Sequence, residues 1–268
     1  MPDNRLARLA VLIDGDNASP RVATGLFEEI AKHGDVSVRR IYGDFSSPRL
    51  KKWADILARH AILPHQQFAN TTGKNSSDIA LVIDAMDLLH SGRCDGFCLV
   101  SSDSDFTRLA ARIREQGVQV LGFGEQKTPE SFRQACHRFI YTENLAPEAP
   151  AQAANSATKP LQHSSAATPL LKKVIAQMDS EDGWVDLGAF GSRLANIFPD
   201  FDSRTYGEKK LSDLVRKTDA FEVDQPEGGR LRMRLKLDRA RAKKGPSGRK
   251  AANKQQRPGP EASEQSKR

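Results

Sequence analysis

The sequence predicts an α/β protein with a mostly parallel sheet flanked by helices, followed by a second, small winged-helix domain of the α+β type. Three observations support this prediction. Short apolar runs alternate with helical patterns from residue 9 to about 145, as in parallel sheets with right-handed crossovers. Acidic clusters directly follow two of these runs, where open α/β sheets bind ligands. Near the C-terminus, residues 230–237 alternate strictly between basic and apolar side chains, which indicates a strand.

The elements of the first domain, residues 1–145, follow from apolar spacing. Apolar runs predict strands at residues 9–13, 36–42, 62–66, 96–100, 119–123 and 138–140. Apolar residues three and four apart predict helices at about residues 21–33, 48–57, 78–90, 106–116 and 130–136. Gly34 and Gly117 are expected to end two of these helices. The helix at 78–90 is apolar on most sides, so we expect it to be well buried.

The composition changes after residue 145. Residues 146–167 are rich in Pro, Ala, Ser, Thr and Gln, and they predict a flexible linker. Residues 168–238 predict a domain with helices at 168–178, 187–198 and 206–217, a short strand or turn at 184–186, and strands at 221–224 and 230–237. Three helices with a two-stranded wing make a winged helix.

The positive charge of the chain is concentrated at its C-terminal end. Residues 239–268 hold ten Lys or Arg and two Glu, a net charge of +8, whereas the whole chain carries +7. Such a tail is expected to be disordered and to attract anions, with nucleic acid the usual partner. A tail that only keeps the protein in solution is the alternative.

The cysteines and the lengths of the apolar segments predict a cytoplasmic location. Cys94, Cys98 and Cys136 have neither metal-ligand spacing nor a disulfide framework, which is typical of reduced thiols. No apolar run approaches the roughly 18 residues that span a bilayer. No apolar signal-peptide segment follows Met1. We therefore expect a cytoplasmic protein without a membrane partner.

Five carboxylates occupy positions suited to metal chemistry. Asp14 and Asp16 follow the first strand, Asp78 opens a helix, and Asp103 and Asp105 follow the fourth strand. Oxygen ligands suit Mg²⁺ or Mn²⁺, and such ions can activate water for phosphodiester hydrolysis. Structural alternatives exist as well: a turn role for Asp16, a helix-dipole role for Asp78 and an N-cap role for Asp103.

Three stretches, LAVLIDGDNAS, KNSSDIALVIDAMDL and CLVSSDSDFTRLAARIREQGVQVLGFG, resemble the NYN domain, a branch of the PIN-like nucleases, over about residues 6–145. The resemblance implies a PIN-like, Rossmann-like fold and metal-dependent ribonuclease activity. It also implies a catalytic and metal-binding set of Asp14, Asp78, Asp103 and Asp105, and all four positions are filled here. Further residues that could support this site are Asp16, Asn17, Asp84, Lys74 and Ser101.

Two of these supporting residues have ordinary alternatives. Asp84 lies six residues after Asp78 and so on another face of the helix. A structural, hydrogen-bonded role is therefore open for Asp84. Lys74 and Ser101 flank the site and could meet a phosphate, although Lys74 could equally be a solvated loop residue.

The stretch TYGEKKLSDLVRKTDAFEVDQ, followed by RLRMRLKL, resembles the OST-HTH, or LOTUS, winged helix over about residues 166–238. This resemblance implies RNA binding or a protein partner. The basic residues that could contact RNA phosphates are Lys209, Lys210, Arg216, Lys217, Arg230, Arg232 and Arg234. A solvated basic strand edge that discourages strand pairing is the alternative.

Together these observations predict a metal-dependent ribonuclease whose C-terminal module and tail bind RNA. Two other functions are open. The first is a catalytically silent adaptor that binds RNA or protein. The second is a haloacid-dehalogenase-like phosphatase, in which Asp14 would be the nucleophile and Asp16 the acid/base. A dinucleotide enzyme is disfavoured because no GxGxxG motif follows a strand.

Overall fold

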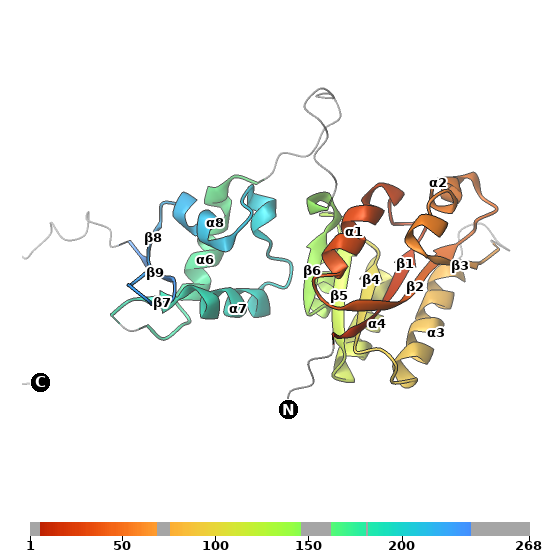
Figure 1. The fold of residues 1–268 in the computed structure, drawn as a ribbon, viewed down its shortest axis with the longest axis horizontal. Helices are drawn as coiled ribbons and strands as arrows, with labels where there is room; N and C mark the ends of the chain where they lie inside the picture. Colours follow the sequence, from red (N-terminus) through yellow and green to blue (C-terminus); the bar gives the residue numbers. More distant parts are fainter. Residues whose placement is uncertain (1–5, 69–75, 146–161, 181, 237–268) are drawn as a thin grey trace, which may run out of the picture. The chain divides into compact units, whose positions relative to one another are not determined.

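The computed structural model describes residues 6–68, 76–145, 162–180 and 182–236 (Figure 1). The predicted basic tail at 239–268, most of the predicted linker, and Lys74 lie outside these ranges. Within the described ranges, each helix is too short or too polar to reach across a lipid bilayer.

The first domain is built on a six-stranded sheet in the order β3-β2-β1-β4-β5-β6, and every neighbouring pair is parallel. Its strands are β1 (Arg8–Asp14), β2 (Asp35–Gly43), β3 (Leu63–Gln66), β4 (Gly96–Val100), β5 (Gln119–Gly124) and β6 (Arg138–Tyr141). The central strands β1 and β4 are almost continuously apolar because both of their faces are covered. The predicted fold class is confirmed.

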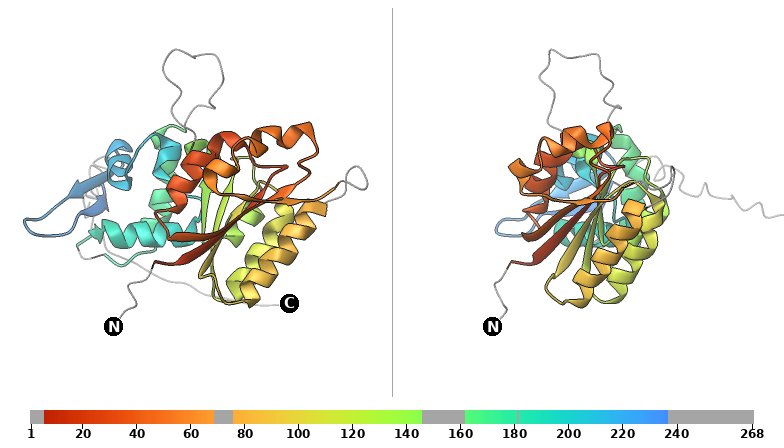
Figure 2. Two further views of the ribbon diagram at one scale, coloured as in Figure 1. Left: turned by 45° about the vertical axis from the view of Figure 1, so that its right-hand side comes forward. Right: turned by 90° about the vertical axis from the view of Figure 1, so that its right-hand side faces the viewer.

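Helices cover both faces of this sheet (Figure 2). They are α1 (Ala23–Ile30), α2 (Lys51–Ala54), α3 (Ser76–His90), α4 (Thr107–Glu115) and α5 (Glu130–Ala135). On one face, α1 and α2 pack on the core that contains Val11 and Ile13. On the other face, α3, α4 and α5 pack on the core that contains Leu12 and Phe97. The carboxyl ends of β1 and β4, where the predicted acidic residues lie, are therefore between two layers of helices.

Three helices of the first domain differ clearly from the sequence prediction. α1 is shorter than residues 21–33, because Pro20–Val22 form a 3-10 turn before it. α2 keeps only one turn of the helix expected at 48–57. The expectation that α3 is buried on most sides is wrong, since Ile79 and Ile83 are 61% and 57% exposed. No element in the described part of the chain covers the outer side of α3.

The second domain contains three helices and a small antiparallel sheet in the order β7-β9-β8. Its elements are α6 (Thr168–Ile175), β7 (Val185–Asp186), α7 (Leu187–Ile197), α8 (Leu211–Lys217), β8 (Phe221–Asp224) and β9 (Arg232–Leu235). The helix expected at 206–217 starts only at Leu211, because Gly207 takes a left-handed conformation with φ of 82° after a 3-10 turn. Residues 164–167, expected in the linker, form a 3-10 turn with Ser164 and Ala167 buried.

Each domain has one tryptophan. Trp53 in the first domain is almost fully buried, and its Nε1 donates a hydrogen bond of 2.9 Å to the carbonyl oxygen of Ala18. Trp184 in the second domain is partly exposed and lies beside β9. The two indoles therefore occupy very different environments.

Candidate active site

Carboxylates from three separate segments meet at the carboxyl edge of the first sheet. Asp14 is the last residue of β1, and Asp103 comes three residues after β4, the strand that pairs with β1 in parallel. Asp78 lies in the first turn of α3. Asp16 and Asp105 follow in the two loops. We call Asp14, Asp16, Asp78, Asp103 and Asp105 the acidic cluster.

Asp14 is the buried member of the acidic cluster, with 1% of its surface exposed. Its Oδ2 accepts hydrogen bonds of 2.7 Å from Asn17 Nδ2 and of 2.7 Å from Ser101 Oγ. Its Oδ1 accepts from the backbone N–H of Asp16 at 3.2 Å. Burial raises the pKa of Asp14 above its ordinary value, although these hydrogen bonds oppose the rise. Asn17 and Ser101 thus orient the Asp14 carboxylate.

The turn after β1 is held against both β2 and α3. The backbone N–H of Gly15 donates to the carbonyl oxygen of Tyr42 at 2.9 Å. A Cβ on Gly15 would stand 2.8 Å from that oxygen, so the close approach requires glycine. Asp16 Oδ2 accepts from Ser77 Oγ at 3.0 Å, which ties the turn to the start of α3.

Asp103 takes the N-cap position that its sequence context offered as an alternative role. Its Oδ1 accepts from the backbone N–H of Asp105 at 2.9 Å at the start of the 3-10 turn Ser104–Phe106. The backbone N–H of Asp103 donates to Ser101 Oγ at 3.0 Å. Ser101 therefore links the loop after β4 to Asp14. A cap occupies one carboxylate oxygen and is compatible with a second role at the other.

The negative charges of the acidic cluster repel one another, and this repulsion affects the pKa of Asp78. The pKa of Asp78 is raised to about 6, first by burial and then by the charges of Asp14, Asp103, Asp16 and Asp105. This rise means that ionised Asp78 lacks sufficient positive charge nearby. A divalent cation would supply that charge.

The cluster is not a preformed metal cage. Among the described residues, no three His, Cys, Asp or Glu side chains stand together in a ligating arrangement. Mg²⁺ is commonly held by one or two carboxylates together with water and substrate phosphates, so it does not need such a cage. Oxygen donors and uncompensated negative charge fit a hard divalent cation.

Asp84 stands apart from the acidic cluster. Its two carboxylate oxygens accept hydrogen bonds from Arg40 Nη1 and Tyr42 Oη, both on β2. Burial raises the pKa of Tyr42, and the Asp84 carboxylate raises it further. No local sequence pattern signals this contact, because Arg40 and Asp84 are 44 residues apart. Ser77 was also missed, although it immediately precedes the expected start of the helix.

The basic residues of the second domain fall into two groups. Arg232 and Arg234 form ion pairs with Asp224 and Glu222, each at 2.7 Å. Their guanidinium carbons lie 4.6 and 4.5 Å from the centre of the Trp184 ring. Both guanidinium groups are thus engaged within the sheet, and their contact with RNA phosphates stays a prediction.

The other predicted basic residues also divide into those that form ion pairs and those that do not. Arg216 pairs with Asp213 at 3.8 Å and Lys217 with Glu208 at 2.5 Å. Of the seven predicted RNA-contacting residues, three form no ion pair with any residue that the structure describes: Lys209, Lys210 and Arg230. Lys210 and Arg230 line an open groove of about 660 Å³ together with Leu187, Leu211 and Leu231. This groove therefore places two exposed basic side chains beside an apolar floor.

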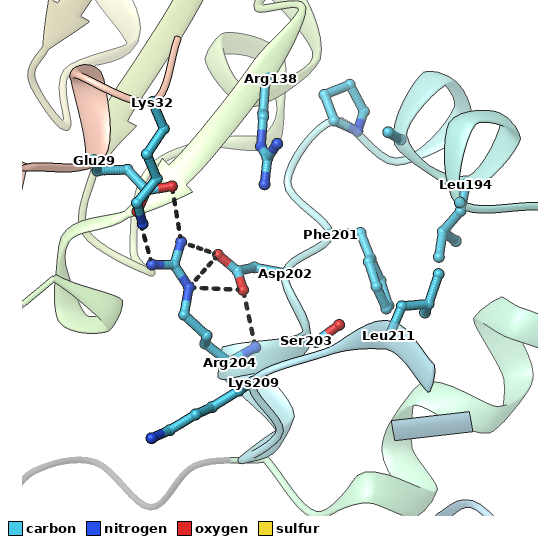
Figure 3. Close-up of a pocket in the computed structure, with 13 residues that line it drawn as sticks. Glu29, Lys32, Arg138, Leu194, Phe201, Asp202, Ser203, Arg204, Lys209 and Leu211 are labelled. Carbon is cyan, nitrogen blue, oxygen red and sulfur yellow. Dashed lines mark hydrogen bonds and ion pairs between the residues drawn. The ribbon is translucent and has the colours of Figure 1, made fainter. Parts of the chain in front are cut away.

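In a separate cavity of about 350 Å³, both carboxylates are paired with basic side chains (Figure 3). Its Arg204 donates to Asp202 at 2.6 Å and to Glu29 at 3.0 Å, and Lys32 donates to Glu29 at 2.7 Å. Lys209 is the one predicted site residue that lines it. With both carboxylates paired, the cavity offers no acidic site for a metal.

Comparisons with known proteins identify both domains. Residues 8–144 match the NYN domain, and residues 162–233 match the OST-HTH/LOTUS domain. A protein of Methanocaldococcus jannaschii, described only as uncharacterized, is 24% identical over 123 residues, which are 44% of this chain and 48% of that protein. The chain therefore spans about half the length of this curated relative.

Two solved structures resemble parts of the chain. A crystal structure of a protein of unknown function from Vibrio parahaemolyticus has a TM-score of 0.46 and 18% identity, and the match covers 53% of this chain and 96% of that one. A solution structure of an uncharacterized protein from Nitrosomonas europaea has a TM-score of 0.26 and 35% identity, and the match covers 34% of this chain and 90% of that one. Since the NYN match takes in just over half of the residues, the chain belongs to the NYN domain family, and an OST-HTH/LOTUS domain follows its NYN domain.

Proposed function

We propose that this protein is a metal-dependent ribonuclease that hydrolyses RNA phosphodiester bonds. The observation that supports the proposal is the convergence of carboxylates from β1, α3 and the loop after β4 at one edge of the sheet. The NYN and LOTUS domains together support a nuclease-type protein that acts on RNA. Carboxylates alone, without a His or Cys nucleophile, suit hydrolysis assisted by a metal.

Each residue of the site has a distinct task in this proposal. Asp14, Asp78, Asp103 and Asp105 would hold Mg²⁺ or Mn²⁺. When bound, such an ion supplies Lewis acidity and lowers the pKa of its water. Asn17 and Ser101 fix the orientation of the Asp14 carboxylate, and Asp16 joins Ser77 at the start of α3.

Ionisation of Asp78 links this site to pH. A carboxyl group with a pKa of about 6 is partly protonated in mildly acidic solution. Protonated Asp78 is a poor metal ligand, so metal binding and cleavage should weaken as the pH falls below about 6. Cation binding would lower the pKa of Asp78 and so shift this limit toward more acidic pH.

The second domain would bring RNA to the site. Lys209, Lys210 and Arg230 are the residues that we assign to phosphate contacts, because their charges are not paired within the described domain. This assignment revises the sequence prediction, which also included Arg216, Lys217, Arg232 and Arg234. The basic tail at 239–268 would add sequence-independent attraction.

A cleavage assay on single-stranded and structured RNA with Mn²⁺ tests the proposal. Asp103→Asn keeps the cap, since Asn and Asp are comparable N-caps, so it should preserve stability while cleavage falls steeply. Asp87→Asn is the matched control, because Asp87 is an exposed acid on the outer side of α3. Wild-type cleavage by Asp103→Asn would refute the site.

A catalytically silent adaptor is the second candidate. One observation favours it: within the described ranges, no three potential ligands are already gathered around a metal position. RNA binding without Mn²⁺-dependent cleavage of any substrate would decide for this candidate. The phosphatase alternative is disfavoured by the NYN match, and trapping a phosphorylated Asp14 would decide for it.

A further inference from the structure

Hydrophobic burial alone defines the rotation of α3 poorly. The helix directs Leu81, Ala85 and Leu88 into the core, yet Ile79 and Ile83 on its outer side are also large and apolar. Rotation by about half a turn, roughly 180°, would exchange these apolar side chains between the two sides. The hydrophobic gain from one setting over another is correspondingly small. A more specific contact must therefore select the observed setting.

The ion pair of Asp84 is such a contact. Arg40 and Tyr42 are two residues apart on β2, so their side chains project from the same face of the sheet. Each donates to a different oxygen of Asp84. The side chain of Arg40 is 25% exposed and Tyr42 is fully buried, so a rotation that withdraws Asp84 would leave both donors largely desolvated and without an acceptor. Only one rotation of α3 satisfies both oxygens.

The same helix carries Asp78. Because α3 is continuous from Ser76 to His90, its setting at Asp84 also determines where Asp78 points. The hydrogen bond from Ser77 to Asp16 is compatible with this setting. We propose that Asp84 is a positioning residue, which fixes the rotation of α3 through Arg40 and Tyr42 and thereby places Asp78 in the acidic cluster. This inference relies on the proposed function only in that the cluster binds a divalent cation.

Two observations separate Asp84 from the metal ligands. Both of its oxygens already accept hydrogen bonds from β2. In addition, the charges that most raise the pKa of Asp78 are those of the other four cluster members, and Asp84 is not among them. Asp84 therefore acts on the site through the helix and not by contact with the cation.

The test replaces the charged pair by apolar residues of similar size. Such replacements of buried ion pairs are often neutral or stabilising. For Arg40→Met/Asp84→Leu, made together with Tyr42→Phe so that the buried Tyr42 hydroxyl does not lose its acceptor, we expect an unchanged or raised urea midpoint in EDTA. In the absence of RNA, its Mn²⁺ affinity measured by calorimetry should fall at least about tenfold, as for residues that orient metal ligands. Asp87→Asn, on the same helix, should change neither quantity.

Two other results for the apolar variant would overturn the inference. Mn²⁺ affinity within about twofold of wild type would show that the pair does not position Asp78, and joint loss of stability and affinity would show a merely structural role. Tyr42→Phe alone provides a second variant that keeps the ring. It should lower Mn²⁺ affinity while the fold is retained, whereas unchanged affinity would count against positioning through β2.

The measurement also separates the two proposals. Wild-type protein that binds Mn²⁺ but cuts no RNA would end the ribonuclease proposal and leave the role of Asp84 intact. Wild-type cleavage together with normal Mn²⁺ affinity in Arg40→Met/Tyr42→Phe/Asp84→Leu would leave the ribonuclease and refute the positioning role. Wild-type protein that binds no Mn²⁺ would overturn both.

Discussion

Replacing Asp78 by Asn should stabilise the metal-free protein at neutral pH. Burial and four neighbouring carboxylates raise the pKa of Asp78 to about 6. In the unfolded chain the same group ionises near pH 3.9. Between these two values the folded state binds more protons than the unfolded state, so the contribution of Asp78 to stability falls as pH rises. Asn carries no ionisable group and avoids this loss.

The size of the effect follows from the pKa difference. A rise of about two units corresponds to about 3 kcal/mol at pH values above both pKa values. Because Asp78 is only partly buried, solvent screening reduces this to about half. The lost attraction between the carboxylate and the N-terminus of α3, roughly 0.3–1 kcal/mol, acts in the opposite direction. The net gain expected for Asp78→Asn is about 1 kcal/mol.

Urea unfolding in EDTA measures this gain directly. At about pH 7.5 the variant should exceed wild type by about 1 kcal/mol, and at about pH 3 the two should agree, because Asp78 is then mostly protonated in both the folded and the unfolded state. Added Mn²⁺ should reverse the order, since a ligand of the folded state stabilises only the protein that binds it. A variant that is less stable than wild type in EDTA at about pH 7.5 would refute the reasoning.

Three further predictions concern other residues. Gly15→Ala should cost about 1–3 kcal/mol in urea unfolding and reduce cleavage, because its Cβ would stand 2.8 Å from the carbonyl oxygen of Tyr42; unchanged values would contradict the close approach. Gln at Lys209, Lys210 and Arg230 should flatten the log–log salt dependence of RNA binding by about 0.7 per lost contact, whereas Gln at Arg232 and Arg234 should not. Trp184→Ala should lower thermal stability by about 1–2 kcal/mol, because it removes two cation–π contacts, and an unaltered melting curve would contradict that role.

Local patterns in the sequence account for most of the fold. The strands β4, β5 and β8 lie within a residue of their predicted ranges, because apolar runs and glycines mark them clearly. The 3-10 turns before α1 and α4 were not predicted, since a hydrophobic period does not distinguish a tight turn from the start of an α-helix.

The site was predictable only where its signals are local. The placement of Asp14 and Asp103 follows from strand ends, which sequence patterns reveal. The link between Asp84 and β2 depends on residues 42 and 44 positions away, and no periodicity encodes such a distance. The pairing of Arg232 and Arg234 was likewise hidden, because a basic strand looks the same whether its charges meet phosphate or Asp224 and Glu222.

The distribution of the two tryptophans gives the protein built-in optical probes. Trp53 reports on the interior of the first domain, and Trp184 reports on the sheet of the second domain. Because indole emission shifts with solvent exposure, the two should fluoresce at different wavelengths. Trp53→Phe and Trp184→Phe would each leave one reporter, so that the unfolding of each domain can be followed separately within the intact chain. A single denaturant series on these variants would then reveal whether the two domains unfold together.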